Sequence, residues 1–323
     1  MRAVVVSRTG GPEVLEVQEL PDPEPGPEQL LVDVEAAGVN FIDVYQREGR
    51  YSLELPFVAG SEAAGVVRAV GASVGDVQVG DRVAWAMLPG TGYTSAAVVP
   101  AARAVPVPDG VSTEQAAAVL LQGMTAHYLC ESTYAVQHGD DVLVHAAAGG
   151  TGLLLTQMVT ARGGRVLATV STDEKAELAR GAGAAEVVRY DREDVVEQVR
   201  RRTGGRGVPV VYDGVGQATF DASLACLARR GVLVLFGASS GAVPPFDPIR
   251  LMSGSLYLTR PTLGDYAADR DELLARSAAV FGEVAAGTLD VRIGQRYALD
   301  EAARAHEDLS GRRTTGKSLL LPG

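Results

Sequence analysis

Apolar runs and glycine-rich breaks alternate along the middle of the chain, from residue 141 to residue 236. Apolar segments of strand length alternate there with segments of helical length, which predicts consecutive βαβ units. Nearly continuous apolar strands are typical of a parallel sheet that helices cover on both faces. We expect strands at 142–144, 165–170, 187–188, 208–212 and 232–236, with helices at 153–161, 172–181, 194–202 and 220–227 between them.

The first 123 residues have a different pattern, in which short strand-like segments follow one another at close spacing. We expect these strands at 3–6, 15–20, 30–37, 63–70, 96–99 and 104–107. A rigid proline-rich loop at 21–27 and one short helix within 39–49 interrupt them. Short strands at this spacing predict a partly open β-barrel. Residues 114–130 are expected to form a helix that leads into the βαβ region.

The last sixty residues resemble the front of the chain in character. They predict a long helix at 269–286, a strand at 291–297, a helix at 300–309 and a final strand at 317–321, and a further strand is expected just before them, at 255–259. We therefore expect the tail to rejoin the N-terminal domain. The predicted domains are 1–123 with 264–323, and a doubly wound α/β domain at 124–263, with a ligand cleft between them.

A glycine turn follows the first strand of the βαβ region. Ala146, Gly149 and Gly152 have the spacing A-x-x-G-x-x-G, a relative of the dinucleotide fingerprint. Glycine adopts positive φ cheaply, and it lets a pyrophosphate approach backbone N–H groups at the positive end of the next helix. The same pattern also occurs in ordinary tight turns. The alternating strands and helices that follow it favour nucleotide binding, beyond the carboxyl ends of the strands.

The end of the second strand of this region indicates which nucleotide is bound. An NAD site usually has an acidic residue there, about 20 residues after the glycines. Here Ser171 lies 19 residues after Gly152, and Lys175 follows one turn into the next helix. A hydroxyl and a cation at this point favour NADPH. Asp173 would weaken this interpretation if its carboxylate pointed inwards. Its simpler role is that of an acidic residue in the first turn of a helix, where it interacts with the helix dipole. Lys175 could equally be a solvated surface lysine.

Composition limits the class of protein. The 323 residues are 46% hydrophobic and 21% charged, which suits two globular domains and argues against disorder. A net charge of −11 disfavours nucleic acid and anionic membranes as partners. Two isolated cysteines form no disulfide framework and fit a reducing compartment. The N-terminus lacks a signal-peptide core, and no apolar run is long enough to span a membrane. We expect a cytoplasmic protein.

Several segments together resemble the zinc-independent medium-chain reductases of the quinone oxidoreductase type, which include zeta-crystallin. The segments carrying the resemblance run almost from end to end: Gly10-Gly-Pro-Glu-Val-Leu, Ala37-Gly-Val-Asn-Phe-Ile-Asp-Val-Tyr, Gly60-Ser-Glu-Ala-Ala-Gly-Val-Val, Val79-Gly-Asp-Arg-Val, Leu121-Gln-Gly-Met-Thr-Ala, His145-Ala-Ala-Ala-Gly-Gly-Thr-Gly, Val211-Tyr-Asp-Gly-Val-Gly and Gly254-Ser-Leu-Tyr-Leu-Thr-Arg-Pro. One departure is Thr151, where valine is usual in the glycine turn. The resemblance implies a GroES-like barrel beside a Rossmann domain, and a homodimer associating through edge strands near Leu256 to Thr259.

The resemblance also implies site residues. Asn40, Tyr45 and Tyr51 would line the cleft near the nicotinamide, Asn40 as an amide donor and Tyr45 as a phenolic one. The alternatives are a turn-stabilising asparagine and aromatic rings packed under a loop; Asp43 is taken as structural. The cofactor would contact Gly149, Gly150, Thr151 and Gly152 at the pyrophosphate, Ser171, Lys175 and Tyr190 around the adenosine end, Phe236 and Gly237 near the nicotinamide ribose, and Thr125. Arg312, or its neighbour Arg313, would reach the 2′-phosphate.

The zinc enzymes of this superfamily carry a cysteine in the segment matching 38–43 and a histidine in the segment matching 60–62. Here those segments read Gly-Val-Asn-Phe-Ile-Asp and Gly-Ser-Glu. A catalytic zinc needs three good protein ligands, and the four histidines show no ligand spacing. His127 and His145 lie in apolar runs and are expected in the core. We expect no metal.

Without a Lewis acid, the reaction must use an acceptor that needs little activation. The sequence therefore predicts an NADPH-dependent quinone oxidoreductase. Two alternatives stay open. One is a 2-alkenal or enoyl double-bond reductase on the same scaffold, and the other is a crystallin-like protein that binds NADPH without useful turnover.

Overall fold

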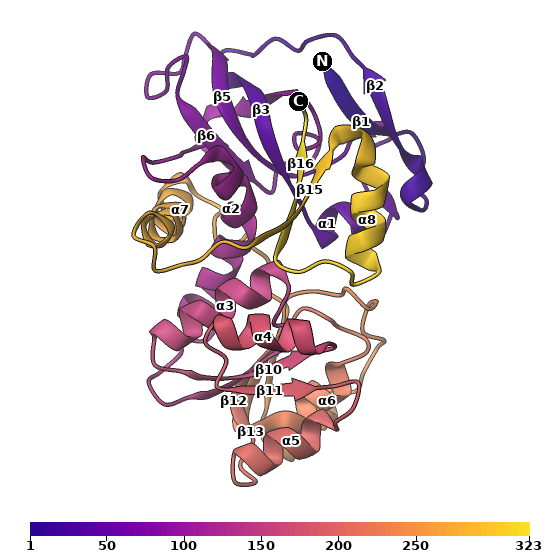
Figure 1. Ribbon diagram of the computed structural model, residues 1–323, viewed down its shortest axis with the longest axis vertical. Coiled ribbons are helices and arrows are strands. Elements are labelled where there is room, and N and C mark those ends of the chain that lie inside the picture. Colours follow the sequence, from indigo (N-terminus) through magenta and orange to yellow (C-terminus); the bar gives the residue numbers. More distant parts are fainter. The chain divides into compact units, whose positions relative to one another are not determined.

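A computed structural model describes all residues from 1 to 323 (Figure 1). The chain forms two compact units, one made of Met1–Met124 with Tyr266–Gly323 and the other of Thr125–Asp265. The C-terminal segment is part of the first unit because its last strand, β16 (Lys317–Leu321), pairs antiparallel with β3 (Gln29–Val39). The tail therefore packs with the front of the chain.

The second unit is a parallel sheet in the order β11-β10-β9-β12-β13-β14. Its strands are β9 (Asp141–Val144), β10 (Arg165–Val170), β11 (Glu186–Arg189), β12 (Val208–Asp213), β13 (Leu227–Leu235) and β14 (Tyr257–Thr259). The connecting helices are α3 (Gly150–Ala161), α4 (Asp173–Gly181), α5 (Val195–Arg202) and α6 (Phe220–Cys226). The strand order reverses between β9 and β12, so the carboxyl ends of these two strands form the switch point where ligands bind in such sheets.

The first unit contains a seven-stranded sheet in the order β15-β16-β3-β5-β6-β8, with β7 also paired to β3, and a three-stranded sheet β2-β1-β4. The remaining strands are β1 (Arg2–Val6), β2 (Leu15–Glu19), β4 (Phe57–Val58), β5 (Glu62–Val70), β6 (Arg82–Ala86), β7 (Ala96–Pro100), β8 (Val105–Pro106) and β15 (Ile293–Ala298). The helices are α1 (Phe41–Arg47), α2 (Thr113–Tyr128), α7 (Arg270–Ala285) and α8 (Ala302–Ser310), and the last four residues of α2 belong to the second unit. Valine and alanine side chains from these strands pack around buried Trp85 and Tyr93. This is the expected barrel-like arrangement.

The structure differs from the expected elements mainly at their ends. The helix predicted to reach residue 130 ends at Tyr128, and a π-helical turn, Leu129–Thr133, follows it. β13 begins at Leu227, earlier than the predicted 232, because its exposed first half, with Arg229 and Arg230, hides the apolar strand pattern. β4 was not expected, since two residues are too few to show a period.

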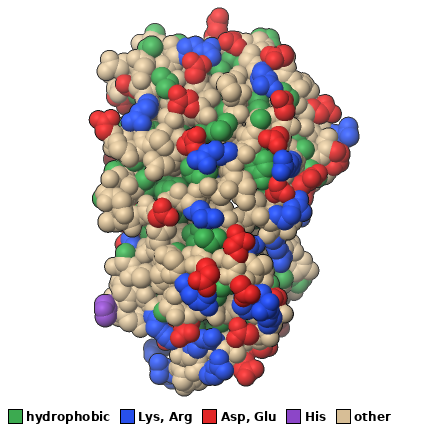
Figure 2. Space-filling model, viewed as in Figure 1, with side chains coloured by type: hydrophobic (Ala, Val, Ile, Leu, Met, Phe, Trp, Pro, Cys, Tyr) green, Lys and Arg blue, Asp and Glu red, His purple; other side chains and the backbone are tan.

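The face of the molecule that Figure 2 shows carries interspersed charges of both signs. The second unit has 14 lysines and arginines against 15 aspartates and glutamates, so nearly all of the net charge of −11 belongs to the first unit. The unit with the glycine turn therefore carries little net charge to repel a phosphate. No helix is both long enough and apolar enough to cross a membrane.

Candidate nucleotide site and active site

The glycine turn lies between the end of β9 and the N-terminus of α3. Gly149 is the N-cap residue, with φ −77° and ψ 171°, and the only positive φ in the turn belongs to Ala146, at +51°. The expectation that these glycines supply positive φ is therefore wrong. A Cβ on Gly152 would lie 2.4 Å from the Ala146 carbonyl oxygen, whereas a Cβ on Gly149 would meet nothing closer than 3.3 Å. Gly152 thus allows the helix to approach the strand.

The first turn of α3 offers an anion site. The N–H groups of Gly150, Thr151 and Gly152 have no intrahelical acceptor, because they belong to the first turn of the helix. The positive end of the helix dipole lies at the same place. Backbone amides at the carboxyl end of β9, beside the switch point, can hold a diphosphate.

A buried chain of side-chain hydrogen bonds joins the three strands that end at this turn. His145 follows β9, and its Nδ1 lies 2.9 Å from Thr169 Oγ1 on β10, while its Nε2 lies 3.0 Å from Ser223 Oγ on α6. Ser223 donates to Asp213 Oδ2 on β12 at 2.7 Å. Since Ser223 gives its proton to the carboxylate, it accepts from Nε2–H, and Thr169 donates to Nδ1. Burial lowers the pKa of His145, so the imidazole is neutral and every member of the chain is satisfied.

Sequence reasoning placed His145 in the core, and the histidine is indeed buried. Its three partners were missed because they come from separate segments, and no spacing links them. The one available signal was a polar residue at or near the end of three of the apolar strands: His145, Thr169 and Asp213.

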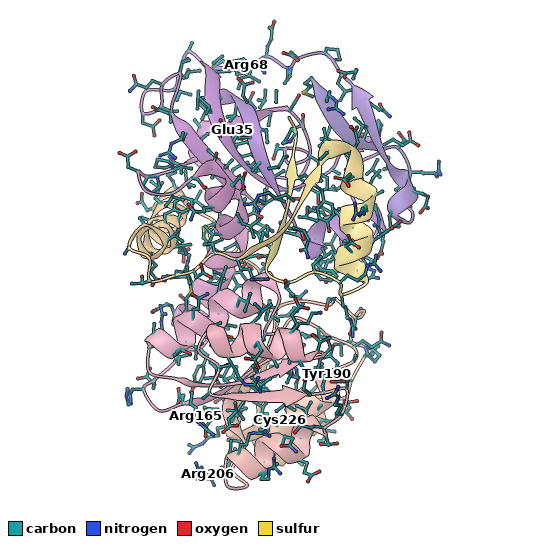
Figure 3. The ribbon with its side chains drawn as sticks, viewed as in Figure 1. Glu35, Arg68, Arg165, Tyr190, Arg206 and Cys226 are labelled. Carbon is teal, nitrogen blue, oxygen red and sulfur yellow. The ribbon has the colours of Figure 1, made fainter.

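The residues expected at the adenosine end come from adjacent strand ends. Ser171 follows β10, Lys175 lies in the first turn of α4, and Tyr190 follows β11. Tyr190 is half-exposed, and its backbone N–H donates to the Val170 carbonyl at 3.2 Å, which places it beside Ser171. Figure 3 shows Tyr190 and Arg165 at opposite ends of this sheet, as the direction of β10 requires.

Asp173 does not present an uncompensated charge to this region. Its carboxylate forms an ion pair with Arg189 and a longer one with Arg192, at 3.8 Å. Arg189 also pairs with Asp191 at 2.9 Å. Two arginines, Arg189 at the end of β11 and Arg192 just after it, therefore balance the charge of Asp173 near the place where a 2′-phosphate is expected.

The other residues that were expected to contact the cofactor belong partly to one unit and partly to the other. Phe236 and Gly237 follow β13, where a Cβ on Gly237 would lie 2.4 Å from the Gly214 carbonyl oxygen, so the ends of β12 and β13 approach closely. Thr125 is buried in α2. Arg312 follows α8 in the first unit, with φ +57°. Its neighbour Arg313 forms an ion pair with Asp308 at 2.7 Å.

The expected catalytic residues surround α1 in the first unit. Asn40 caps this helix, and its backbone N–H donates to Asp43 Oδ2 at 2.9 Å. Tyr45 is buried and Tyr51 is 45% exposed, and their rings meet edge to face at 5.4 Å. The guanidinium of Arg50 lies 5.5 Å from the centre of the Tyr45 ring. The structure thus brings all three expected residues to one helix and its flanking loop.

The side chain of Asn40 is fully used inside the protein. Its Nδ2 donates to Glu62 Oε2 at 2.8 Å and to the Gly38 carbonyl at 3.3 Å. Its Oδ1 accepts from Lys317 Nζ at 2.7 Å and from Gln122 Nε2 at 3.4 Å. An amide carries two N–H bonds and two lone pairs, so no donor remains for a substrate in this arrangement. Glu62 and Lys317 were not anticipated, because they lie far from Asn40 in sequence.

A second buried chain fixes the other end of α1. Arg47 donates to His306 Nδ1 at 3.3 Å, His306 Nε2 lies 3.0 Å from the Tyr93 hydroxyl, and this hydroxyl donates to Asp43 Oδ2 at 3.0 Å. Burial raises the pKa of Asp43 to about 6, and burial followed by the charge of Arg47 lowers the pKa of His306 to about 3. Asp43 Oδ1 is buried without a partner.

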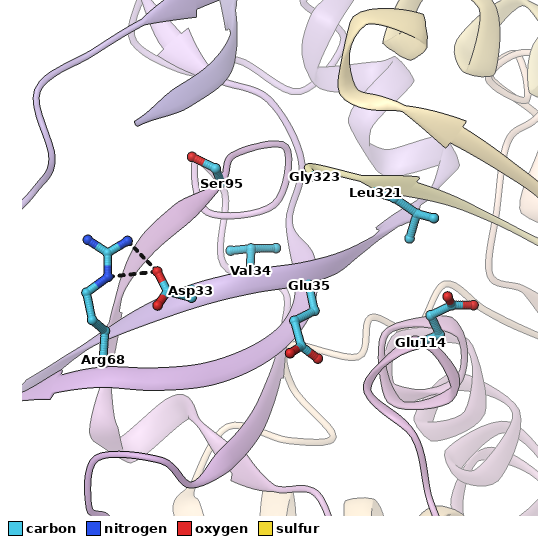
Figure 4. A pocket seen from close by; sticks show the side chains of 8 residues that line it. All are labelled: Asp33, Val34, Glu35, Arg68, Ser95, Glu114, Leu321 and Gly323. Carbon is cyan, nitrogen blue, oxygen red and sulfur yellow. Dashed lines mark hydrogen bonds and ion pairs between the residues drawn. The ribbon is translucent and has the colours of Figure 1, made fainter.

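A surface hollow of about 540 Å³ lies elsewhere on the first unit (Figure 4). Its walls include Asp33 and Glu35 of β3 and Arg68 of β5, and Arg68 forms an ion pair with Asp33. Glu35 precedes Asn40 by five residues, about 16 Å along an extended strand. The hollow contains none of the expected site residues. No group of three or more His, Cys, Asp or Glu side chains is arranged to hold a metal ion.

The doubly wound sheet with its glycine turn, together with the partly open barrel, defines a medium-chain dehydrogenase/reductase. Residues 150–279 match the family described as zinc-binding dehydrogenase, and residues 26–109 match the alcohol dehydrogenase GroES-like domain. The chain is 48% identical to a quinone oxidoreductase of Pseudomonas aeruginosa over 97% of each chain, and 41% identical to a 2-haloacrylate reductase of a Burkholderia species over 99% of this chain and 98% of the relative.

A solved structure of the mycobacterial protein Rv1454c complexed with NADPH is 51% identical, with a TM-score of 0.97 and full coverage of both chains. The chain belongs to the zinc-independent quinone oxidoreductase family of medium-chain reductases.

Proposed function

We infer that this chain is an NADPH-dependent oxidoreductase that transfers a hydride to a quinone without a metal. The observation that carries this inference is the set of unpaired first-turn amides of α3 at the switch point, with Lys175 and no unbalanced carboxylate at the end of β10. Similarity to quinone oxidoreductases, and to a relative complexed with NADPH, supports it.

Bound NADPH would supply the hydride, and the residues of this chain bind, orient and desolvate the reactants. We propose that Gly149, Gly150, Thr151 and Gly152 hold the diphosphate and that Ser171, Lys175 and Tyr190 contact the adenosine phosphate. Phe236, Gly237 and Thr125 complete the proposed cofactor contacts, and Arg312, or its neighbour Arg313, is proposed for the 2′-phosphate.

We propose that Tyr45 and Tyr51 contact the acceptor. A quinone gains negative charge on oxygen as it accepts a hydride, and a phenol can donate a hydrogen bond to that oxygen. Asn40 is proposed to contribute by capping the helix that carries Tyr45. Changing Tyr45 to Phe would lower kcat for a quinone and leave the Kd for NADPH unchanged.

The chain contains only two lysines, Lys175 and Lys317, against 27 arginines, which permits a direct test. An amine acetylating reagent should modify Lys175, which is partly exposed, and the N-terminus of the folded protein, and mass spectrometry reports each site separately. NADPH should slow acetylation of Lys175 at least tenfold, and NADH much less. Equal rates with and without NADPH would count against the proposed phosphate contact. Buried Lys317 is the internal control, because its modification would reveal unfolding.

A second candidate is a double-bond reductase acting on activated α,β-unsaturated substrates, because the 2-haloacrylate reductase is 41% identical over nearly the whole chain. Steady-state NADPH oxidation with 1,4-benzoquinone and with 2-alkenals separates the two functions. Faster alkenal turnover would favour this candidate. A crystallin-like NADPH-binding protein would show no acceptor-dependent oxidation with any compound of a broad panel.

We also propose a cytoplasmic homodimer that associates through β14. This strand is the last of its sheet, so one edge lacks a partner, and such an edge can pair with a second copy. Exposed apolar side chains surround it: Ile249, Met252 and Tyr257, the last 61% exposed. Sedimentation should give twice the mass of 33.6 kDa for the natural protein and a monomer for Leu258→Pro. A monomeric natural protein would contradict the proposal.

A further inference from the structure

Lys317 is one of two lysines in a chain that otherwise uses arginine for its basic residues. Its side chain is 2% exposed and forms a 2.6 Å ion pair with Glu62, which is completely buried. Burial of a charge pair is costly unless hydrogen bonds satisfy both groups. The ammonium also donates to Asn40 Oδ1 at 2.7 Å, so this pair is built around the residue that caps α1.

Four elements of the first unit converge on this ion pair. Glu62 lies at the start of β5, Lys317 at the start of β16 and Asn40 just after β3. Glu62 Oε1 accepts from the backbone N–H of Leu121 in α2 at 2.6 Å. A Cβ on Gly38 would lie 2.2 Å from Glu62 Oε2, so glycine at this position leaves room for the carboxylate.

The two charged groups allow only one orientation of the Asn40 amide. An ammonium only donates hydrogen bonds and an ionised carboxylate only accepts them. If the amide were reversed, its NH₂ would face the ammonium of Lys317 and its oxygen would face the carboxylate of Glu62. A neutral pair of hydrogen-bonding groups, each able to donate and accept, would permit both orientations.

We propose that Lys317 and Glu62 are positioning residues of the reductase. They lock the amide of Asn40, hold the N-terminus of α1, and thereby place Tyr45 for the acceptor; the inference rests on the proposed function. α1 has seven residues, too few for a helix that is stable by itself. Its other end is held by the chain from Arg47 through His306 and Tyr93 to Asp43. The helix is therefore fixed at both ends by buried side chains.

Lysine suits this position better than arginine does. The ammonium is a compact charge with three donors, whereas a guanidinium has five donors in a rigid planar fork. Asn40 and Glu62 provide the only two acceptors found for the ammonium. An arginine would leave at least two further donors buried without partners, so Lys317→Arg should not restore the function that Lys317→Met loses.

The test separates positioning from stability. Lys317→Met leaves Glu62 buried without its partner and should lower both kcat and the denaturation midpoint. Lys317→Met combined with Glu62→Gln removes both charges, so the midpoint should recover towards that of the natural protein. We expect kcat of this double variant to stay at least tenfold low with an unchanged Kd for NADPH. Recovery of kcat together with the midpoint would overturn the proposal.

Hydrogen exchange provides a readout that does not depend on the reaction. The amides of residues 41–47 should exchange at least tenfold faster in the double variant than in the natural protein. Arg296→Met is the matched control: it lies on β15, the strand next to β16, it removes a surface ion pair with Glu114 of α2, and it should change neither exchange nor kcat. If the amides of 41–47 exchanged equally fast in both proteins, the positioning role would be overturned, whether or not the protein reduces quinones. If exchange were faster in the double variant but the natural protein reduced no quinone, only the proposed function would be overturned.

Discussion

The imidazole of His145 and the hydroxyl of Ser223 are hydrogen-bonded at 3.0 Å, next to the turn that carries the proposed diphosphate site. This bond is the middle of the chain from Thr169 to Asp213, and all four side chains are buried. Removing the imidazole would leave the buried hydroxyl of Thr169 without its partner, deprive Ser223 of the hydrogen bond that it accepts, and open a cavity. Each such defect costs about 1–3 kcal/mol.

We therefore expect His145→Ala to lower the free energy of unfolding by roughly 2–4 kcal/mol and to weaken NADPH binding, because the ends of β9, β10 and β12 lose their common link. Urea denaturation and calorimetric titration with NADPH measure the two effects. His138→Ala is the control, since His138 is exposed, and it should change neither quantity. A His145 variant that binds NADPH with full affinity would show that the chain serves the fold alone.

The two outer glycines of the turn should respond differently to alanine. In Gly152→Ala the new Cβ would lie 2.4 Å from a backbone oxygen, so the helix must shift and stability should fall by several kcal/mol. In Gly149→Ala the Cβ would lie 3.3 Å from the Ala146 carbonyl oxygen, which a shift of a few tenths of an ångström relieves, and the φ of −77° suits any residue. This variant should keep its denaturation midpoint and bind NADPH at least tenfold more weakly. Equal loss of stability in both variants would contradict this distinction.

Ala146 gives a complementary prediction, because it is the residue of the turn with positive φ. A non-glycine residue in the left-handed region costs about 1–2 kcal/mol, which the greater entropy of glycine in the unfolded chain partly offsets. Ala146→Gly should therefore raise the free energy of unfolding by roughly 0.5–1 kcal/mol. A decrease in urea denaturation experiments would show that the methyl group of Ala146 has contacts worth more than the strain.

Lys175 is expected to set the preference for NADPH over NADH. The 2′-phosphate is the only group that distinguishes the two cofactors, and a charge-assisted hydrogen bond to it contributes about 1.5–3 kcal/mol. Lys175→Ala should raise the KM for NADPH about tenfold or more and leave that for NADH nearly unchanged. Steady-state rates with both cofactors measure this selectivity. Arg180→Ala, five residues after Lys175 on the same helix, is the control. If it lost as much selectivity as Lys175→Ala, the cause would be a general effect of charge.

The fold was largely predictable from the sequence, whereas the interactions inside the site were not. The strands β9, β10 and β12 have apolar patterns that reflect burial on both faces of a sheet, and the glycine turn follows directly from the first of them. In contrast, the contact of Asn40 with Lys317 joins residues 277 positions apart. No local period or propensity records such a pairing, because it depends on which strands become neighbours. For the same reason the sequence could point to Asn40 as a candidate site residue but could not show that its amide is already hydrogen-bonded to Glu62 and Lys317.

Asp43 and His306 should have opposite effects on stability between about pH 4 and pH 6. The pKa of Asp43 is raised from 3.8 to about 6, so in this range the folded protein retains a proton that the unfolded chain has lost, and stability falls as pH rises. The pKa of His306 is lowered from 6.5 to about 3, so the unfolded chain binds a proton that the folded protein excludes, and stability rises with pH. Tyr93 lies between the two groups, and Arg47, Glu62 and Lys317 are the charges that face them.

Because the two contributions oppose each other, the natural protein should show a weak pH dependence of stability across this window. Asp43→Asn removes one of them, so the free energy of unfolding of this variant should rise, relative to that of the natural protein, by about 1 kcal/mol per pH unit from pH 4 to pH 6. Urea denaturation at pH 4, 5, 6 and 7 measures this difference. His306→Asn is the matched variant, and its relative stability should change in the reverse direction. If plots of the free energy of unfolding against pH ran parallel for Asp43→Asn and the natural protein, the carboxyl of Asp43 would have a pKa near its ordinary value. The buried chain from Arg47 to Asp43 would then not hold a proton on Asp43 in this pH range.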